Sequence, residues 1–464
     1  MISAPTFLKL AFASDDEAER IDYMLNRLRM VNVANSEAES RYEGSWQATQ
    51  FGISIPPNMR GLHTPAGWDG TVVDVLEERL DWLGWASDGD DFGLADVFSA
   101  NGLDVDGGMA HLDSLIFGLS FVTVGSGFDD EPNPLVTPHS PTTMTATWDR
   151  RTRRLSSALA TVTEDGDVVE ATLYTLGSTA TFSRQGGRWH AVDRDAHNLT
   201  RLPVVAVPNR VRGSRDLGRS EITKPIRYYS DAAARTLLGL EVNREFYNAP
   251  QRIGLNVSDS MFEDEAGNPV SPWTSIMGRV WNIPANEDPD GPAPDVKQFN
   301  PASPSPYLDQ VQGYAKRVAS EAGIPTTYFG IETANPASAD AIRAAESRLV
   351  KRAERRQASF GRSWLEVGRL ALMVRDGQLP DTYDTSVSTK WRDPSTPTRA
   401  ASADEATKLI AAGVLPSDST VTYDRVGLSP AEQRQVAADK RRSGGTQALA
   451  SILERTNADP DATA

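Results

Sequence analysis

The sequence predicts an α+β protein in which long helices flank a region of short strands. Residues 144–207 contain short, β-branched and partly alternating segments, with glycine-containing turns at Gly166 and Gly186 between them, a pattern typical of an antiparallel meander. Residues 339–375 carry the apolar period of one helix of about 37 residues. With 464 residues, 39% of them hydrophobic and 24% charged, the chain can hold several parts around a buried core.

Composition excludes several classes of protein. The chain has no cysteine, which excludes disulfides, thiolate metal sites and cysteine nucleophiles. The longest apolar stretch, residues 115–124, is about half the length of a membrane-spanning helix, so we expect no membrane partner. Three acidic residues directly follow the apolar patch near the start, and no basic residue precedes it. We therefore expect no secretory signal.

The charge balance limits how the chain can bind nucleic acid. There are 47 basic and 63 acidic residues, a net charge of −16. Non-specific binding depends on Lys and Arg at the phosphates, so this chain should not coat DNA over its whole surface. It can contact DNA locally, or repel it.

No motif for catalysis or nucleotide binding is present. GxxxxGK[ST], GxSxG, HExxH and GxGxxG are all absent, and the five histidines lack the spacing of a helical metal site. The acidic run at residues 88–91 resembles the start of a calcium loop, but Ser99 stands where a bidentate Glu is required. We expect a solvated acidic loop there. Paired carboxylates abound, and none is singled out as a catalytic pair.

Apolar periodicity predicts helices on both sides of the strands. Before them lie residues 15–39, 72–83 and 109–119, and after them residues 220–248 and 307–322. Residues 250–306 hold ten of the 29 prolines, which excludes a long helix and favours a stiff insertion with strands at 253–257 and 279–283.

The longest predicted helix begins after Ser338, an N-cap residue, and ends before Gly377. We expect Gly361 and Gly368 to bend it. A strand at 385–391 and two shorter helices, at 403–412 and 430–442, complete the prediction.

This helix carries an unusual distribution of charge. Residues 339–375 hold nine Arg or Lys and four Asp or Glu, within an acidic chain. Arg348, Arg355, Arg362 and Arg369 recur every seven residues and lie opposite an apolar stripe. Two interpretations stay open: a face that is solvated or paired with acidic neighbours in the same chain, or a face that meets an acidic partner, such as an adjacent copy of the chain.

Several short segments, in this order, resemble a known family. They are GLSFV at 118–122, WD at 148–149, LGRSEI at 217–222, PQR at 250–252, SPYLD at 305–309, GIPTTYFG at 323–330, NPASADA at 335–341 and KWRDP at 390–394. Together with the order of helix, proline-rich insertion, helix, loop and very long helix, they make the chain similar to portal proteins, the head–tail connectors of tailed double-stranded DNA phages. The similarity extends from about residue 42 to about residue 432.

The resemblance implies a portal fold with a mixed wing, long stem helices, a small β-containing clip and a helical crown, assembled as a ring. It implies these parts: an N-terminal region and wing at 1–217, a first stem helix at 218–249, a clip at 250–304, a second stem helix at 305–323, a tunnel loop at 324–338, a long wing helix at 339–376, a wing return strand at 377–399, and a crown with C-terminal tail at 400–464.

The resemblance also implies a function. A ring of twelve subunits at one capsid vertex of the virion, assembled in the host cytoplasm, forms the channel for packaging and ejection of double-stranded DNA. The implied partners are other copies of the chain, the packaging ATPase (terminase large subunit), a head–tail adaptor, and the major capsid and scaffolding proteins. No catalytic residue, metal or cofactor is implied.

Two groups of site residues follow from the resemblance. The tunnel-loop residues are Thr326, Thr327, Tyr328, Phe329, Glu332, Thr333 and Asn335. Lys316 and Arg317 are expected to form a sparse basic ring in the channel, and the arginines of the long helix to contact a neighbouring subunit. Pairing of Lys316 and Arg317 with acidic neighbours remains an alternative.

Two other functions stay open from the residues. One is a capsid or adaptor protein that does not conduct DNA, and the other is a hydrolase that uses an acidic pair.

Overall fold

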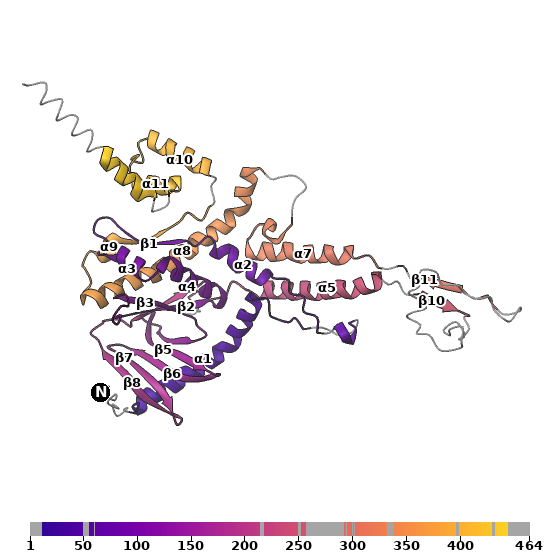
Figure 1. Cartoon of the computed structure of the whole chain (residues 1–464), viewed down its shortest axis with the longest axis horizontal. Coiled ribbons are helices and arrows are strands. Elements are labelled where there is room, and N and C mark those ends of the chain that lie inside the picture. The colour runs from indigo at the N-terminus through magenta and orange to yellow at the C-terminus, as the bar shows by residue number, and fades with distance from the viewer. Residues whose placement is uncertain are drawn as a thin grey trace, which may run out of the picture. The chain divides into compact units, whose positions relative to one another are not determined.

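The computed structural model describes most of the chain. The described residues are 12–49, 55–59, 61–213, 218–248, 252–256, 292–293, 295–298, 300, 302–331, 338–395, 399–428 and 432–443. The chain divides into two compact units, Met1–Pro394 and Ser395–Ala464. In the first unit, helices surround two β-sheets, and a pair of long helices projects from them (Figure 1). No helix in the described ranges has the length and hydrophobicity needed to cross a membrane.

Helix α1 (Asp15–Tyr42) begins with a complete capping box. Ser14 Oγ accepts the N–H of Glu17, and the Glu17 carboxylate accepts the N–H of Ser14. The inner face of α1 buries Ile21, Met24 and Leu25 against the meander sheet, with Phe182 and Trp189 on the other side of this core. The predicted helix is confirmed and runs three residues further.

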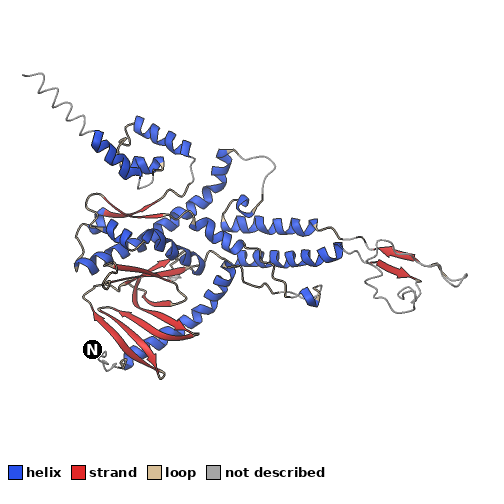
Figure 2. Cartoon of the chain, in the orientation of Figure 1, coloured by secondary structure: helices blue, strands red, loops and turns tan. Residues whose placement is uncertain are grey.

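The predicted meander is also confirmed. Its strands are β4 (Met144–Asp149), β5 (Arg154–Glu164), β6 (Asp167–Thr175), β7 (Ser178–Gln185) and β8 (Arg188–Ala196). They form one antiparallel five-stranded sheet in chain order (Figure 2). At the β5–β6 turn, Asp165 and Gly166 both have positive φ, 49° and 88°, as a tight hairpin requires.

The central core lies between a second sheet and the helices α2 (Trp68–Glu77), α3 (Leu94–Ala100) and α4 (Leu103–Phe117). This sheet has the order β3-β2-β9, from β2 (Leu119–Gly125), β3 (Leu135–His139) and β9 (Val204–Pro208). The helix predicted at 72–83 ends at Glu77, because the chain turns there into β1 (Trp82–Ser87). Trp82 stacks on Trp364 with ring centroids 3.9 Å apart, so its apolar period reflects burial in a strand.

Helices α5 (Lys224–Asn248) and α7 (Ser305–Ala322) run side by side (Figure 1). Gly239 permits this approach, since a Cβ there would lie 3.2 Å from the Tyr307 ring. The predicted start of α5 at residue 220 is wrong by four residues. The N–H of Glu221 bonds to the carbonyl of Leu115, which holds the segment before α5 outside the helix.

A two-stranded antiparallel sheet follows α5, made of β10 (Arg252–Leu255) and β11 (Asp295–Gln298). The strand predicted at 253–257 corresponds to β10, which begins one residue earlier. Its partner β11 was not predicted. The strand predicted at 279–283 lies outside the described residues.

Helix α8 (Ala339–Asp376) is confirmed to within one residue of the prediction. Ser338 caps its first turn by accepting the N–H of Ala341, and Gly377 ends it with a φ of 73°. Gly361 and Gly368 have a different role from the predicted bend. A Cβ at Gly361 would lie 2.6 Å from Thr389 Oγ1, and one at Gly368 2.6 Å from the Tyr383 hydroxyl, so both allow close packing of the segment after α8.

After α8 come α9 (Tyr383–Ser386) and β12 (Val387–Trp391), which pairs with β1. The strand predicted from residue 385 therefore begins two residues later. The second unit contains α10 (Arg399–Ala411), α11 (Thr420–Val426) and a helical stretch at 432–443. The helix predicted at 403–412 corresponds to α10 and that at 430–442 to the last stretch, whereas α11 was not predicted.

Candidate functional site

Three clusters of polar side chains join the base of the α5–α7 pair to the rest of the first unit. We call them the Arg41 cluster, the Glu221 cluster and the Tyr328 cluster. Each brings together segments that are far apart in the sequence. Because burial of unpaired charges is costly, the partners in each cluster fix one another's positions.

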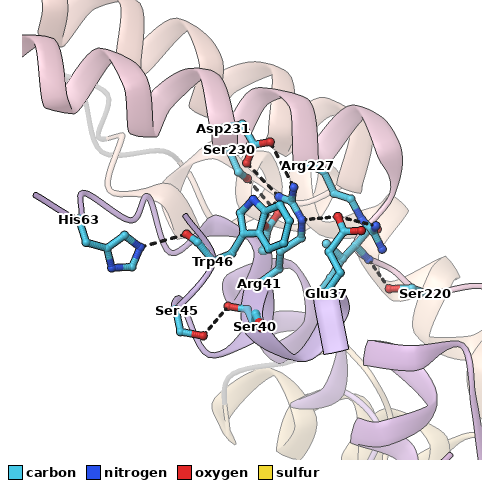
Figure 3. A network of polar contacts seen from close by, with 12 residues as sticks. Glu37, Ser40, Arg41, Ser45, Trp46, His63, Ser220, Arg227, Ser230 and Asp231 are labelled. Carbon is cyan, nitrogen blue, oxygen red and sulfur yellow. Dashed lines mark hydrogen bonds and ion pairs between the residues drawn. The ribbon is translucent and has the colours of Figure 1, made fainter. Parts of the chain in front are cut away.

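The Arg41 cluster connects α1 and α2 to α5 (Figure 3). The Arg41 guanidinium donates to both carboxylate oxygens of Asp231 at 3.0 and 3.1 Å, and to Glu37 at 2.9 Å. Ser230 donates to Asp69 at 2.9 Å. Such a bidentate arginine–carboxylate pair sets orientation as well as distance, so it fixes the direction in which α5 leaves the core.

The charges of this cluster act unequally on its carboxyl groups. Burial raises the pKa of Asp69 above its ordinary value, because its hydrogen bonds and the Arg41 charge do not fully offset the loss of water. Burial also opposes ionisation of Glu37, but the hydrogen bond from Arg41 and the Arg227 charge overcome it and lower its pKa. Glu37 therefore stabilises the ionised cluster more than Asp69 does.

The Glu221 cluster connects the segment before α5 to α8. The Glu221 carboxylate is 1% exposed and accepts from Arg352 and Arg356, each at 2.6 Å. Asn209 donates to it at 3.1 Å and Arg210 at 3.3 Å. Burial would raise the pKa of Glu221, but the charges of Arg352 and Arg356 overcome it and hold the pKa below its ordinary value.

Two glycines bring the backbone close enough for this cluster to form. A Cβ on Gly218 would lie 1.8 Å from the carbonyl oxygen of Gly118 and 2.3 Å from that of Asn209. A side chain does not fit there. The conserved-looking order of LGRSEI at 217–222 thus has a physical basis: a glycine for close approach, then the buried Glu221, then the buried Ile222.

The Tyr328 cluster connects α7 to α8 and to the end of α2. The Tyr328 hydroxyl accepts from Arg79 at 2.7 Å and donates to Glu346 at 3.1 Å. Burial raises the pKa of this hydroxyl, so it keeps the proton that it donates. The neighbouring Phe329 packs edge-on against Trp68, with ring centroids 6.3 Å apart.

The structure thus places the first four predicted tunnel-loop residues in an anchored turn. Thr326, Thr327, Tyr328 and Phe329 form the 3-10 helix η3 (Thr326–Phe329). Tyr328 and Phe329 pack against the central core. Glu332, Thr333 and Asn335 lie outside the described residues.

The two predicted basic-ring residues lie on the exposed side of α7. Lys316 and Arg317 are both exposed, while Ala315 and Val318 beside them are buried. Within the described ranges neither forms an ion pair. The structure thus gives no support to their pairing with acidic neighbours in the same chain.

The arginine stripe of α8 divides into two kinds of residue. Arg369 forms ion pairs with Glu366 and Asp384, and Arg348 donates to the carbonyl of Ser320 at 2.8 Å. Arg355 and Arg362 are exposed and have no ion pair with a described residue. Pairing within the chain therefore accounts for Arg369, and two arginines remain available to a partner.

Sequence reasoning missed the arginines that hold Glu221. Arg356 lies three residues after the buried Ala353 and four before the buried Phe360, on the apolar face of the helix. An arginine at a core position indicates a buried carboxylate partner. That signal was present in the sequence.

The structure does not support a catalytic or metal site among the residues that it describes. No group of three His, Asp or Glu side chains is arranged there to hold a metal ion. His111 is fully buried, accepts from Trp364 Nε1 at 2.8 Å, and has its pKa lowered to about 3 by burial, as a neutral core residue. Asp90 and Asp91 of the acidic loop accept the backbone N–H groups of Phe92 and Gly93.

Comparison with known proteins places the chain in a family. The family model "Phage portal protein, SPP1 Gp6-like" matches residues 76–442. The portal protein of Mycobacterium phage D29 is 34% identical over 437 residues, covering 91% of this chain and 88% of the relative. That of Mycobacterium phage L5 is 34% identical over 396 residues, covering 82% of this chain and 79% of the relative.

Solved structures give a weaker likeness. The neck of a native GTA particle, computed with C12 symmetry, is 14% identical with a TM-score of 0.41, covering 82% of this chain and 95% of that one. The virion of a native gene transfer agent particle is 15% identical with a TM-score of 0.40, covering 85% and 99%.

The mixed helix-and-sheet fold and the sequence matches define a structural protein of the phage particle. The chain belongs to the phage portal protein family, SPP1 Gp6-like. The resemblance drawn from the sequence is confirmed, and with it a portal function in the virion.

Proposed function

We propose that twelve copies of this chain close into a ring at one capsid vertex and form the channel through which double-stranded DNA is packaged and ejected. The observation that carries the proposal is the 34% identity to a portal protein over 91% of the chain. The anchored α5–α7 pair supports it, because a ring that guides DNA needs struts whose direction is fixed.

In this proposal the parts of the chain have distinct roles. Residues 1–217 with 377–399 are the wing, α5 and α7 are the stem, residues 250–304 are the clip, and residues 400–464 are the crown. Segment 324–338 is the tunnel loop, of which η3 is the anchor. Helix α8 joins stem to wing through the Glu221 and Tyr328 clusters.

The channel contacts DNA without holding it. The net charge of −16 raises the cost of phosphate adhesion, and a few basic groups guide the duplex. Lys316 and Arg317, exposed and without an ion pair in the described ranges, are suited to such a sparse ring. Arg355 and Arg362 on α8 are suited to a contact with a neighbouring subunit.

The ring acts with other components of the particle. The sequence has no GxxxxGK[ST], so a separate packaging ATPase (terminase large subunit) drives translocation. The ring also binds a head–tail adaptor and the major capsid and scaffolding proteins, and it assembles in the host cytoplasm. The chain consumes no substrate and needs no cofactor.

The test is the assembly state of the purified protein. Mass photometry should show a closed species at a whole multiple of 50.4 kDa, and negative-stain images should show a central hole. A protein that remains monomeric under capsid-assembly conditions contradicts the proposal.

A further inference from the structure

The outer face of α1 carries an apolar patch that nothing in its own chain covers. Tyr23, Met30 and Val33 are 59%, 79% and 77% exposed. Their spacing of seven and three residues puts them on one side of the helix, away from the buried Ile21 and Met24. Isolated exposed apolar residues are ordinary, but a continuous patch of this kind marks a binding surface.

This patch has a positive rim. From residue 23 to residue 34 the charged side chains are Arg27 and Arg29, which lie on opposite sides of Met30 around the helix. Neither forms an ion pair within the described part of the chain. We call this surface the α1 face: Tyr23, Met30 and Val33 with Arg27 and Arg29.

A second exposed apolar patch lies on α4, and its rim is negative. Val105 and Met109, one helical turn apart, are 66% and 51% exposed. Asp104 and Asp106 flank Val105, and a Cβ on Gly108 would lie 3.6 Å from Glu77 Oε1, which places the Glu77 carboxylate beside the patch. We call this surface the α4 face: Val105 and Met109 with Asp104, Asp106 and Glu77.

The carboxylates of the α4 face lack positive partners among the residues that the structure describes. Burial raises the pKa of Glu77, and the nearby charges of Asp81, Asp74 and Glu78 raise it further. An arginine from outside the chain would relieve this repulsion. The α4 face therefore favours a partner that is apolar at its centre and positive at its edge.

The two faces are complementary, yet both are exposed in the same chain. A cyclic ring requires this arrangement, because each subunit presents one surface to the neighbour on one side and a different surface to the neighbour on the other. An apolar centre with charged groups at the rim is the usual anatomy of such an interface. We propose that the α1 face of one copy docks on the α4 face of the next copy in the ring.

This inference rests on the proposed ring and adds the surfaces that close it. A first experiment uses the absence of cysteine in the chain. In the full-length variant M30C/M109C, a short bis-maleimide should link neighbouring copies into a ladder of covalent oligomers. The single variants M30C and M109C should give no ladder. The matched control M30C/L176C, which moves the second thiol to another apolar residue that is 67% exposed, should give none either.

A second experiment reverses the charges. The variant R27E/R29E has two negative faces and the variant D104R/D106R has two positive ones, so each alone should form rings at least about tenfold less efficiently than the unmodified protein. An equimolar mixture should assemble again, because every contact then joins opposite charges. Circular dichroism and thermal unfolding confirm that each variant is folded.

The outcomes separate this inference from the proposed function. If the unmodified protein forms rings, but M30C/M109C does not cross-link and either charge variant assembles alone as well as the unmodified protein, the ring exists and these faces do not close it. If the unmodified protein forms no ring at all, the proposed function itself fails. Rescue in the mixture together with the ladder supports the inference.

Discussion

Arg356 on α8 donates to Glu221 at 2.6 Å, across 135 residues of sequence and in a place where Glu221 is 1% exposed. This contact fixes the start of α5 against the longest helix of the chain. Since the carboxylate is buried, its partners have no water to replace it.

Removing this carboxylate should be costly. In Glu221→Gln, Arg352 and Arg356 keep their charges without a buried counter-ion, so the free energy of unfolding should fall by about 3–5 kcal/mol. Thermal unfolding of the purified protein measures this. The control Glu354→Gln breaks the exposed pair with Lys351 and should cost about 1 kcal/mol or less. Equal losses in the two variants would contradict the role given to the Glu221 cluster.

Gly218 should not tolerate a side chain. In Gly218→Ala the new Cβ would lie 1.8 Å from the carbonyl oxygen of Gly118, so the backbone must separate, at a cost of about 3 kcal/mol or more. At Gly213 a Cβ would meet no atom within 4 Å, and Gly213→Ala should leave the melting temperature nearly unchanged. Differential scanning fluorimetry distinguishes the two. A stable Gly218→Ala would mean that the two strands of backbone are further apart than described.

The pairing of Glu17 with Arg194 should make stability depend on pH. The hydrogen bond from Arg194 lowers the pKa of Glu17 to about 2. A carboxyl group with a lowered pKa stabilises the fold at pH values above its ordinary value of 4.5, and this contribution is lost as the pH falls toward about 2. Because Arg194 is 45% exposed, solvent screening limits the effect to about 1 kcal/mol.

Glu17→Gln isolates this effect, since glutamine can keep the capping box of α1. The variant should lose stability near neutral pH and show a flatter dependence on pH below 4.5 than the unmodified protein. Urea unfolding across this range measures the difference. Glu19→Gln, on the same helix and without an ion pair to a described residue, is the control. An unchanged pH profile in Glu17→Gln would rule out this pair as its source.

The tunnel-loop proposal predicts a loss of packaging without a loss of assembly. Replacing residues 332–337 by a Gly-Ser segment of the same length keeps η3 and its contacts with Arg79 and Glu346. Rings should form as before, and the amount of DNA packaged into proheads should fall. Full packaging with the replaced segment would contradict the proposal.

Lys316 and Arg317 should matter for DNA and not for the fold. Both are exposed on α7, so Lys316→Ala/Arg317→Ala should leave unfolding and ring formation nearly unchanged. Packaging should slow, and its salt dependence should become weaker, because fewer phosphate contacts release fewer counter-ions. Lys408→Ala/Arg425→Ala, which removes two exposed cations from the second unit, is the matched control. Equal effects of the two double variants would remove the basis for a basic ring on α7.

Local signals explain what the sequence predicted well. Ser338 and Gly377 mark the ends of α8, and the turns at Gly166 and Gly186 mark the hairpins of the meander. Each depends on residues within a few positions of one another. The same locality explains why α1, α5 and α7 were found.

Contacts between distant segments explain what was missed. β1 is a strand because it pairs with β12, about 300 residues later, and no local pattern contains that information. The partners of Arg41 and Glu221 are likewise 28 to 190 residues away. For this reason the sequence named Glu221 within a recognisable segment but could not assign its role.

The three polar clusters have a mechanical consequence. Apolar surfaces can slide over one another at little cost, whereas hydrogen-bonded ion pairs have preferred directions and resist shear. Arg41, Glu221 and Tyr328 hold the root of the α5–α7 pair at separate points on α1, α2 and α8. A load applied at the far tip of this pair is therefore transmitted to the body as torque, in the way that a mast stepped with three stays moves the hull beneath it.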